Sequence, residues 1–177
     1  QYNGCNLLIY IKEIFYMSLQ AVQLFFASHG REGDIVVHEQ STASVQEAAD
    51  AIGVHPARIA KTLCFQGKET PVLVVAAGDT KVDNAKFKQI FGTKAKMLDP
   101  DSVLQVTGHS IGGVCPFGLV TDVPVYLDAS LTRFTTVHPA CGSANSSIEL
   151  TIEELKNYAN AKDVVDVCKE WDPTLTE

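Results

Sequence analysis

Residues 108–118 read Gly-His-Ser-Ile-Gly-Gly-Val-Cys-Pro-Phe-Gly and combine backbone freedom with groups that can react. Glycine lets the backbone approach a ligand closely, and proline fixes the turn that holds such a loop open. Backbone N–H groups in a loop of this kind can bind a carbonyl oxygen or a phosphate. The segment therefore predicts the wall of a pocket for a small molecule or the end of a nucleotide. The alternative is an ordinary surface turn.

A thiol and an imidazole in this segment suggest a second chemistry. Cys115 could act as a nucleophile with His109 as its general base, and Asp122 or Asp128 could orient the imidazole. A cysteine is, however, often only a small buried residue, and a lone histidine is usually structural. Nucleophilic catalysis by Cys115 therefore ranks below a simple pocket role for the segment.

Small residues gather again in residues 140–147, Ala-Cys-Gly-Ser-Ala-Asn-Ser-Ser. A loop rich in hydroxyls can bind an amino group, a ribose or a polar side chain. Cys141, Gly142 and Ser143 are therefore candidates for the opposite wall of the same pocket. A hairpin loop made of turn residues explains the composition equally well.

Lys61 lies where a short helical turn is expected to meet the apolar strand Thr62–Phe65. An enclosed ammonium needs an anionic or strongly polar partner, such as a phosphate or an ester carbonyl. A lysine whose stem lies along a strand end while its charge reaches water is the competing interpretation, and spacing alone favours it.

Charge is unevenly distributed along a chain of net charge −7. Counting Lys and Arg against Asp and Glu gives −4 for residues 1–57, +5 for residues 58–96 and −8 for residues 97–177. The basic middle segment, which includes Lys81, Lys86 and Lys88, is a candidate contact for a phosphate backbone. A solvated lysine face is the equally simple alternative. The acidic total argues against DNA as a partner.

The composition excludes several classes of protein. The five cysteines are odd in number and form no CxxC pair, so a disulfide scaffold or zinc site is not expected and a reducing cytoplasm fits best. Histidines and carboxylates show no metal-ligand spacing, and no apolar run is long enough to span a bilayer. We expect no metal, no cofactor and no membrane partner.

Helices and strands are expected to alternate without a regular βαβ rhythm. This favours an α+β (mixed α/β) domain whose barrel-like sheet is flanked by helices. Residues 1–16 differ from the rest of the chain and are predicted to be a non-native leader, so that residues 17–177 form a single domain. The expected helices cover residues 17–29, 44–53, 83–91, 99–106 and 163–171, and a further helix is expected to begin at residue 151. The expected strands cover residues 34–38, 61–65, 70–77, 94–98, 123–127, 135–138 and 147–150.

Several ordered motifs resemble the YbaK/EbsC proteins, relatives of the editing domain of bacterial prolyl-tRNA synthetases. They are Ala60-Lys61-Thr62-Leu63, then Ala76–Asp79 with Asn84–Phe87, then Gly112–Gly118, then Gly142-Ser143 with Ile148-Glu149-Leu150. The stretch Gly112–Pro116 matches the family's GxxxP element. The resemblance runs from about Leu19 to Tyr158 and implies the barrel-like fold of that editing domain. Ser147 stands where the relatives have an acidic residue, so their amino-acid specificity is not carried over.

The resemblance implies hydrolysis of the ester in a mischarged aminoacyl-tRNA, by a pocket-positioned water or with help from the substrate. The tRNA is expected to be that for proline, or a related one, carrying a small amino acid. Lys61 would position the tRNA 3′ end, and backbone N–H groups of Gly113 to Cys115 would stabilise the oxyanion. The substrate-binding residues would be His38, His109, Gly112, Val114, Pro116, Phe117, Gly118, Cys141, Gly142 and Ser143. The tRNA backbone would be bound by Lys81, Lys86 and Lys88.

Two other functions remain open at this point. The chain could be a non-catalytic module that binds tRNA or an aminoacyl-tRNA synthetase. It could also be a cysteine hydrolase that uses Cys115 and His109.

Overall fold

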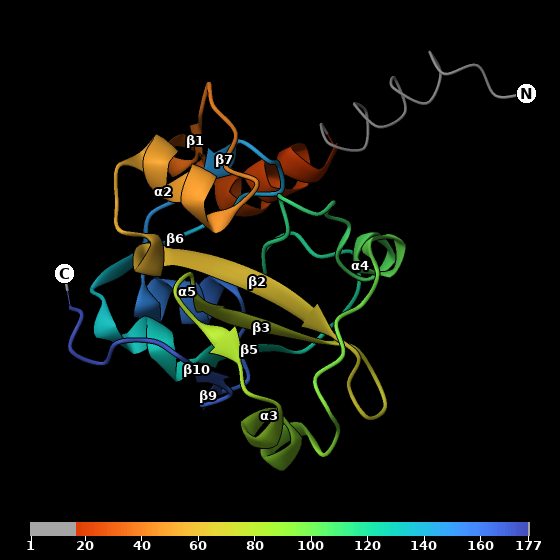
Figure 1. Cartoon of the computed structure of the whole chain (residues 1–177). Coiled ribbons are helices and arrows are strands. Elements are labelled where there is room, and N and C mark those ends of the chain that lie inside the picture. Colours follow the sequence, from red (N-terminus) through yellow and green to blue (C-terminus); the bar gives the residue numbers. More distant parts are fainter. Residues whose placement is uncertain (1–16, 177) are drawn as a thin grey trace, which may run out of the picture.

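The computed structural model describes residues 17–176, and the leader predicted over residues 1–16 lies outside the described residues. Figure 1 shows a curled mixed sheet with helices around it. The six-stranded sheet has the order β8-β6-β2-β3-β5-β9. Its strands are β2 (Ile59–Phe65), β3 (Val72–Ala77), β5 (Val125–Asp128), β6 (Thr136–Pro139), β8 (Leu150–Thr151) and β9 (Val164–Val165). This architecture confirms the predicted fold class.

The sheet mixes parallel and antiparallel strand pairs. β2 pairs antiparallel with β3 but parallel with β6, and β3 pairs parallel with β5. β3 is apolar throughout and buried along its whole length, as its sequence predicts for a central strand. Two short ribbons complete the strands: β1 (Val36–Val37) with β7 (Ser146–Ser147), and β4 (Lys81–Val82) with β10 (Cys168–Lys169).

The helices begin and end where local signals place them. Capping boxes open α2 (Val45–Ile52) and α5 (Ile152–Tyr158), while Asp side chains cap α3 (Asn84–Phe91) and α4 (Pro100–Thr107). Residues 17–27 are helical, and short 3₁₀ turns cover Glu32–Asp34, Pro56–Arg58 and Ala129–Arg133. None of the helices in the described chain is long and apolar enough to cross a membrane.

Three expectations about elements were wrong. Residues 163–171 form β9 and β10 instead of a helix, because pairing with β5 and β4 outweighs local propensity. Residues 94–98 make only an isolated bridge between Met97 and Phe65, and residues 147–150 are divided between β7 and β8.

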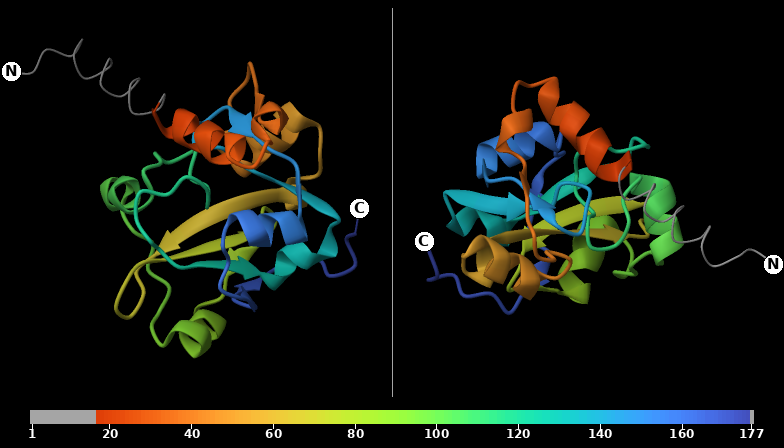
Figure 2. Two further views of the ribbon diagram at one scale, coloured as in Figure 1. Left: turned by 180° about the vertical axis from the view of Figure 1, so that it is seen from behind. Right: turned by 90° about the horizontal axis from the view of Figure 1, so that it is seen from above.

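Packing places the glycine-rich loop on a firm base. In the views of Figure 2, the helix over residues 17–27 lies across the end of the molecule that carries β1 and β7. Its Phe26 meets Phe117 with ring centroids 4.9 Å apart, and both residues are fully buried in the larger core cluster. The loop that the sequence marks as a pocket wall is thus fixed from behind by aromatic packing.

Candidate active site

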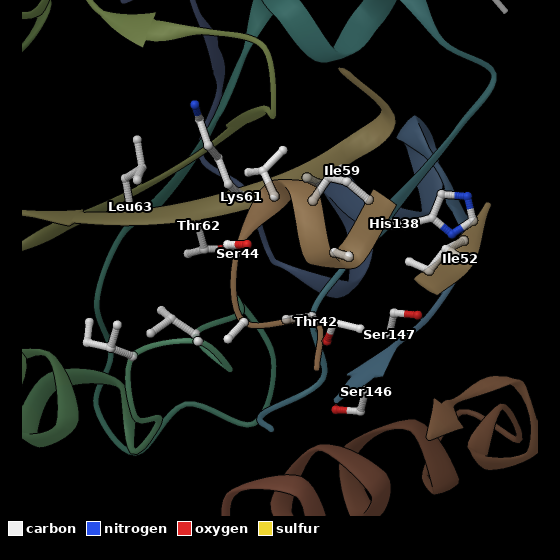
Figure 3. Close-up of a pocket in the computed structure, with 18 of the residues that line it drawn as sticks. Thr42, Ser44, Ile52, Ile59, Lys61, Thr62, Leu63, His138, Ser146 and Ser147 are labelled. Atoms are coloured by element: carbon white, nitrogen blue, oxygen red, sulfur yellow. The ribbon is translucent and has the colours of Figure 1, made fainter. Parts of the chain in front are cut away.

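A cavity of about 220 Å³ lies between α2, β2, the glycine-rich loop and the β6–β7 region (Figure 3). Its wall is mostly apolar, with Ile59 and Leu63 from β2 and Val45 and Ile52 from α2. Such a cleft, with few polar groups, is the usual form of a small-molecule site.

Three buried polar atoms on this wall have no hydrogen-bond partner among the described residues. They are Thr42 Oγ1, Thr62 Oγ1 and His138 Nε2. Buried polar atoms in native proteins nearly always have partners, and each exception needs a physical explanation. All three residues line the same cavity, and Figure 3 shows them distributed along it, with His138 beside Ile52. A polar ligand in this cavity would satisfy them.

Lys61 is among the residues that line the cavity, but its ammonium is held elsewhere. Lys61 and Thr62 point to opposite faces of β2 in Figure 3. Lys61 Nζ donates to the carbonyl oxygens of Gly78 at 3.2 Å and Thr80 at 2.5 Å. Burial lowers the pKa of Lys61, partly offset by the nearby Cys168, Asp79 and Asp128. The lysine is enclosed, as one of the two sequence interpretations requires, and its hydrogen-bond acceptors are backbone carbonyls.

Only part of the predicted loop reaches the cavity. Gly112 and Val114 line it, whereas Gly113, Pro116, Phe117 and Gly118 do not. The Gly113 N–H donates to the Ser110 carbonyl at 3.0 Å, so in this conformation it is not available to an oxyanion.

The loop is braced from the side by the second small-residue segment. The Gly142 N–H donates to the Gly113 carbonyl at 3.0 Å, and Ser143 Oγ donates to Ser146 Oγ at 2.6 Å. Cys141, Gly142 and Ser143 are buried behind the wall and do not line the cavity. The ends of the segment, Ala140, Ser146 and Ser147, line the cavity, whereas its middle residues support the wall from behind.

Cys115 and His109 do meet, but in a setting unsuited to a nucleophile. Cys115 Sγ lies 3.4 Å from His109 Nε2, and both side chains are fully buried away from the cavity. Burial raises the pKa of Cys115 to about 12 and lowers the pKa of His109. His109 is further fixed by Ser18 Oγ at 2.5 Å and by the Phe117 carbonyl at 2.7 Å. The pair has the features of a structural contact.

Neither aspartate considered for this pair serves it. The Asp128 carboxylate is fully buried and accepts from the backbone N–H groups of Ser130 and Val167, each at 2.9 Å. Asp122 is exposed and is not a hydrogen-bond partner of His109. Among the described residues, no three His, Cys, Asp or Glu side chains are grouped as a metal site would require.

His38 lines a second, wider cleft of about 860 Å³ that adjoins the cavity. The two hollows share Ile52, His138 and Ser147. His38 Nε2 lies 2.8 Å from Ser147 Oγ, a contact made possible by the pairing of β1 with β7. The predicted pocket residue is therefore at the shared wall and reaches the cavity only through Ser147.

Comparisons with known proteins agree with this geometry. Residues 39–158 match the model of the aminoacyl-tRNA editing domain. The chain belongs to this family. It is 55% identical over 157 residues to the uncharacterised protein YwhH of Bacillus subtilis, spanning 88% of this chain and 100% of that protein. EbsC of Enterococcus faecalis, named as a candidate Cys-tRNA(Pro)/Cys-tRNA(Cys) deacylase, is 29% identical over 67% of this chain and 74% of its own.

A solved structure also matches the fold of this editing domain. The crystal structure of a candidate trans-editing enzyme for prolyl-tRNA synthetase superposes with a TM-score of 0.78 at 31% identity. The match covers 86% of this chain and 97% of that one. The editing domain is accordingly an aminoacyl-tRNA deacylase, an enzyme that hydrolyses the ester between amino acid and tRNA.

The lysines predicted to contact tRNA differ in their surroundings. Lys81 pairs with Glu170 and Lys86 pairs with Asp166, each at 2.8 Å, and these carboxylates raise the pKa of both lysines. Lys88 is exposed and has no ion-pair partner among the described residues. Two of the three predicted contacts are thus already neutralised within the editing domain.

Sequence reasoning missed the polar atoms that matter most in this cavity. Thr42, Thr62 and His138 were not predicted as site residues, although Thr62 adjoins Lys61 and His138 precedes a proline next to the serine-rich loop. The available signal for Thr62 is its place within the Ala60–Leu63 motif. Thr42 has no comparable signal, because its burial follows from the Thr42 N–H bonding to the Ala144 carbonyl at 2.6 Å.

Proposed function

We propose that this editing domain acts in trans on mischarged tRNA for proline, or a related tRNA, and removes a small wrong amino acid. The carrying observation is the cavity of about 220 Å³ in which Thr42, Thr62 and His138 each leave a buried polar atom unpartnered. The aminoacylated 3′ end of a tRNA brings an amino group, an ester and a ribose hydroxyl, which are polar partners of the kind these atoms lack. The likeness to a trans-editing enzyme for prolyl-tRNA synthetase supports the choice of tRNA.

The proposed chemistry needs no enzyme nucleophile. An aminoacyl ester is already activated, so holding it next to a positioned water supplies most of what hydrolysis requires. Burial lowers the pKa of His138, which keeps its ring neutral near pH 7. A neutral ring can accept a hydrogen bond from the attacking water while the Thr62 hydroxyl donates to the ester. The small, largely apolar cavity selects substrates by size.

Lys61 completes the proposed site from the edge. The residue lines the cavity, and its ammonium donates to the Gly78 and Thr80 carbonyls. In this proposal the ammonium exchanges one carbonyl for a polar group of the tRNA 3′ end. Because the reaction acts on charged tRNA, we place the protein in the cytoplasm, where a proline-specific synthetase is a candidate partner.

The test is deacylation of a panel of tRNAs for proline carrying alanine, cysteine, serine, threonine or 2-aminobutyrate, beside cognate pairs. Wild type is expected to release one or a few of the wrong amino acids, and Lys61→Ala is expected to lose this activity. Thr62→Val is expected to lower kcat/KM about tenfold, the value of one neutral hydrogen bond.

Thr70→Val is the matched control for Thr62→Val, because Thr70 is exposed and lies outside the cavity. It should leave kcat/KM unchanged. Binding of charged tRNA by the wild type without release of any amino acid would refute the deacylase and favour a binding module.

A further inference from the structure

We propose that four lysines beside the cavity form a docking surface for the phosphate backbone of the tRNA acceptor stem. They are Lys68, Lys88, Lys94 and Lys96, which we call the lysine face. The inference rests on the proposed function, because it assigns the surface to the tRNA whose ester enters the cavity.

One scaffold carries all four side chains. Lys68 lies in the turn between β2 and β3, Lys88 on α3, and Lys94 and Lys96 in the segment that follows α3. These parts pack around Phe87, whose ring centroid is 4.9 Å from Phe65 and 4.6 Å from Phe91. α3 and the β2–β3 turn lie at the same end of the molecule in Figures 1 and 2.

Backbone contacts fix this arrangement. The Gln66 N–H donates to the Lys96 carbonyl at 2.8 Å, which ties the β2–β3 turn to the segment after α3. A Cβ placed on Gly92, the cap of α3, would lie 3.9 Å from Lys68 Cδ. The stem of Lys68 therefore runs against the end of α3, close to the segment that carries Lys94 and Lys96.

The charge of the lysine face is uncompensated within the described chain. All four lysines are exposed and none makes an ion pair there, in contrast to Lys81 with Glu170. Of the three acidic residues in residues 58–96, Asp79 pairs with Arg133 and Asp83 caps α3, which leaves Glu69. A cluster of lysines on a protein of net charge −7 is the footprint expected for a polyanion.

The lysine face lies next to the cavity, because the chain runs directly from Lys96 to Met97 in the cavity wall. Met97 follows Lys96, lines the cavity and bridges to Phe65 of β2. The Leu98 N–H then donates to the Cys64 carbonyl at 3.0 Å, which holds this segment along β2. A tRNA whose terminal ester lies in the cavity therefore has its nearest backbone phosphates at the lysine face. An acidic protein could bind the positive charge, but it would have no ester to place in the neighbouring cavity.

The test compares two variants that each remove four positive charges. The first replaces Lys68, Lys88, Lys94 and Lys96 with glutamine. The matched control replaces Lys12, Lys156, Lys162 and Lys169 with glutamine, which gives the same net charge from other parts of the chain. Binding of uncharged proline tRNA is measured between 50 and 200 mM salt. Deacylation is measured with whole aminoacylated tRNA and with the aminoacylated trinucleotide CCA.

The lysine-face variant is expected to bind tRNA at least about 10-fold more weakly at 50 mM salt. Its slope of log K against log salt should fall by about 3 to 4, since each duplex phosphate contact contributes about 0.9. kcat/KM for whole tRNA should fall with it, while the trinucleotide, which reaches only the cavity, is hydrolysed at the wild-type rate.

Three results would overturn the proposal: an unchanged salt slope, an equal loss in the control variant, or a wild-type dimer that the lysine-face variant abolishes in sedimentation. Failure of the proposed function has a different signature, because wild type would then hydrolyse neither substrate. The tRNA-binding comparison would still decide the lysine face in that case.

Discussion

Adding one methyl group at Gly113 should move the wall of the cavity. A Cβ at this position would lie 2.6 Å from the Gly142 carbonyl carbon and 2.7 Å from the Ser143 nitrogen. The lower limit of ordinary contact is 3.4 Å, so the two loops must separate by about 0.8 Å. The obstructing atoms belong to the backbone, which cannot rotate away as a side chain would.

The magnitude follows from this displacement. Forcing an extra carbon into packed structure costs about 1–3 kcal/mol, which lowers Tm by about 2–12 °C in a chain of this length. Shifting the neighbouring Gly112 and Val114 by about 1 Å should reduce kcat/KM for deacylation about 10²-fold. Gly33→Ala is the control, because its Cβ would meet nothing within 4 Å and its φ is ordinary.

The assay pairs thermal unfolding with deacylation of the preferred mischarged tRNA for both variants. Gly33→Ala should match wild type in both measurements. Wild-type Tm and kcat/KM in Gly113→Ala would refute the packing argument. A lowered Tm with unchanged kcat/KM would refute the link between loop position and catalysis.

Two further variants and a pH series test other parts of the site. Cys115→Ala should keep kcat/KM within about threefold of wild type, because a pKa of about 12 leaves a thiolate fraction of about 10⁻⁴ at pH 8; a loss above about 10³-fold would instead establish a cysteine hydrolase. Burial lowers the pKa of His109 and His138 in the folded protein. Below about pH 6.5 the unfolded chain therefore binds more protons than the folded protein, and the free energy of unfolding decreases as the pH decreases. Urea unfolding at pH 7.5, 6.0 and 5.0 should show this decline, and His138→Gln should reduce it; a flat profile would contradict the assignment.

Local signals explain which elements could be predicted. The capping boxes at Ser44 and Thr151 and the aspartates before α3 and α4 act within four residues, so sequence alone placed these helices. β9 and β10 depend on partners about 37 and 86 residues away, Leu127 with Val164 and Val82 with Cys168. Their own residues carry no local sign of that pairing, which is why a helix was expected there.

The same distinction applies to the site. Glycine spacing identified a loop that does line the cavity, through Gly112 and Val114. It could not separate wall from support, because Gly112, Gly113 and Gly142 are the same residue type and the fold decides what each one touches. A hydroxyl without a partner, such as that of Thr62, is defined wholly by folded neighbours. A sequence pattern therefore cannot predict which hydroxyl lacks a hydrogen-bond partner.

The unpartnered atoms allow stability and function to be separated. Each buried polar atom left without a partner costs about 1–3 kcal/mol, against a total stability of about 5–15 kcal/mol. Replacing Thr62 by the isosteric valine removes that cost, so Thr62→Val should leave Tm unchanged or raise it while deacylation falls. Gly113→Ala should lower both quantities together. If both variants lose activity but only Gly113→Ala lowers Tm, the unpartnered hydroxyl of Thr62 reduces the stability of the fold while serving the reaction. The substrate would then supply the hydrogen bond that Thr62 lacks in the free protein.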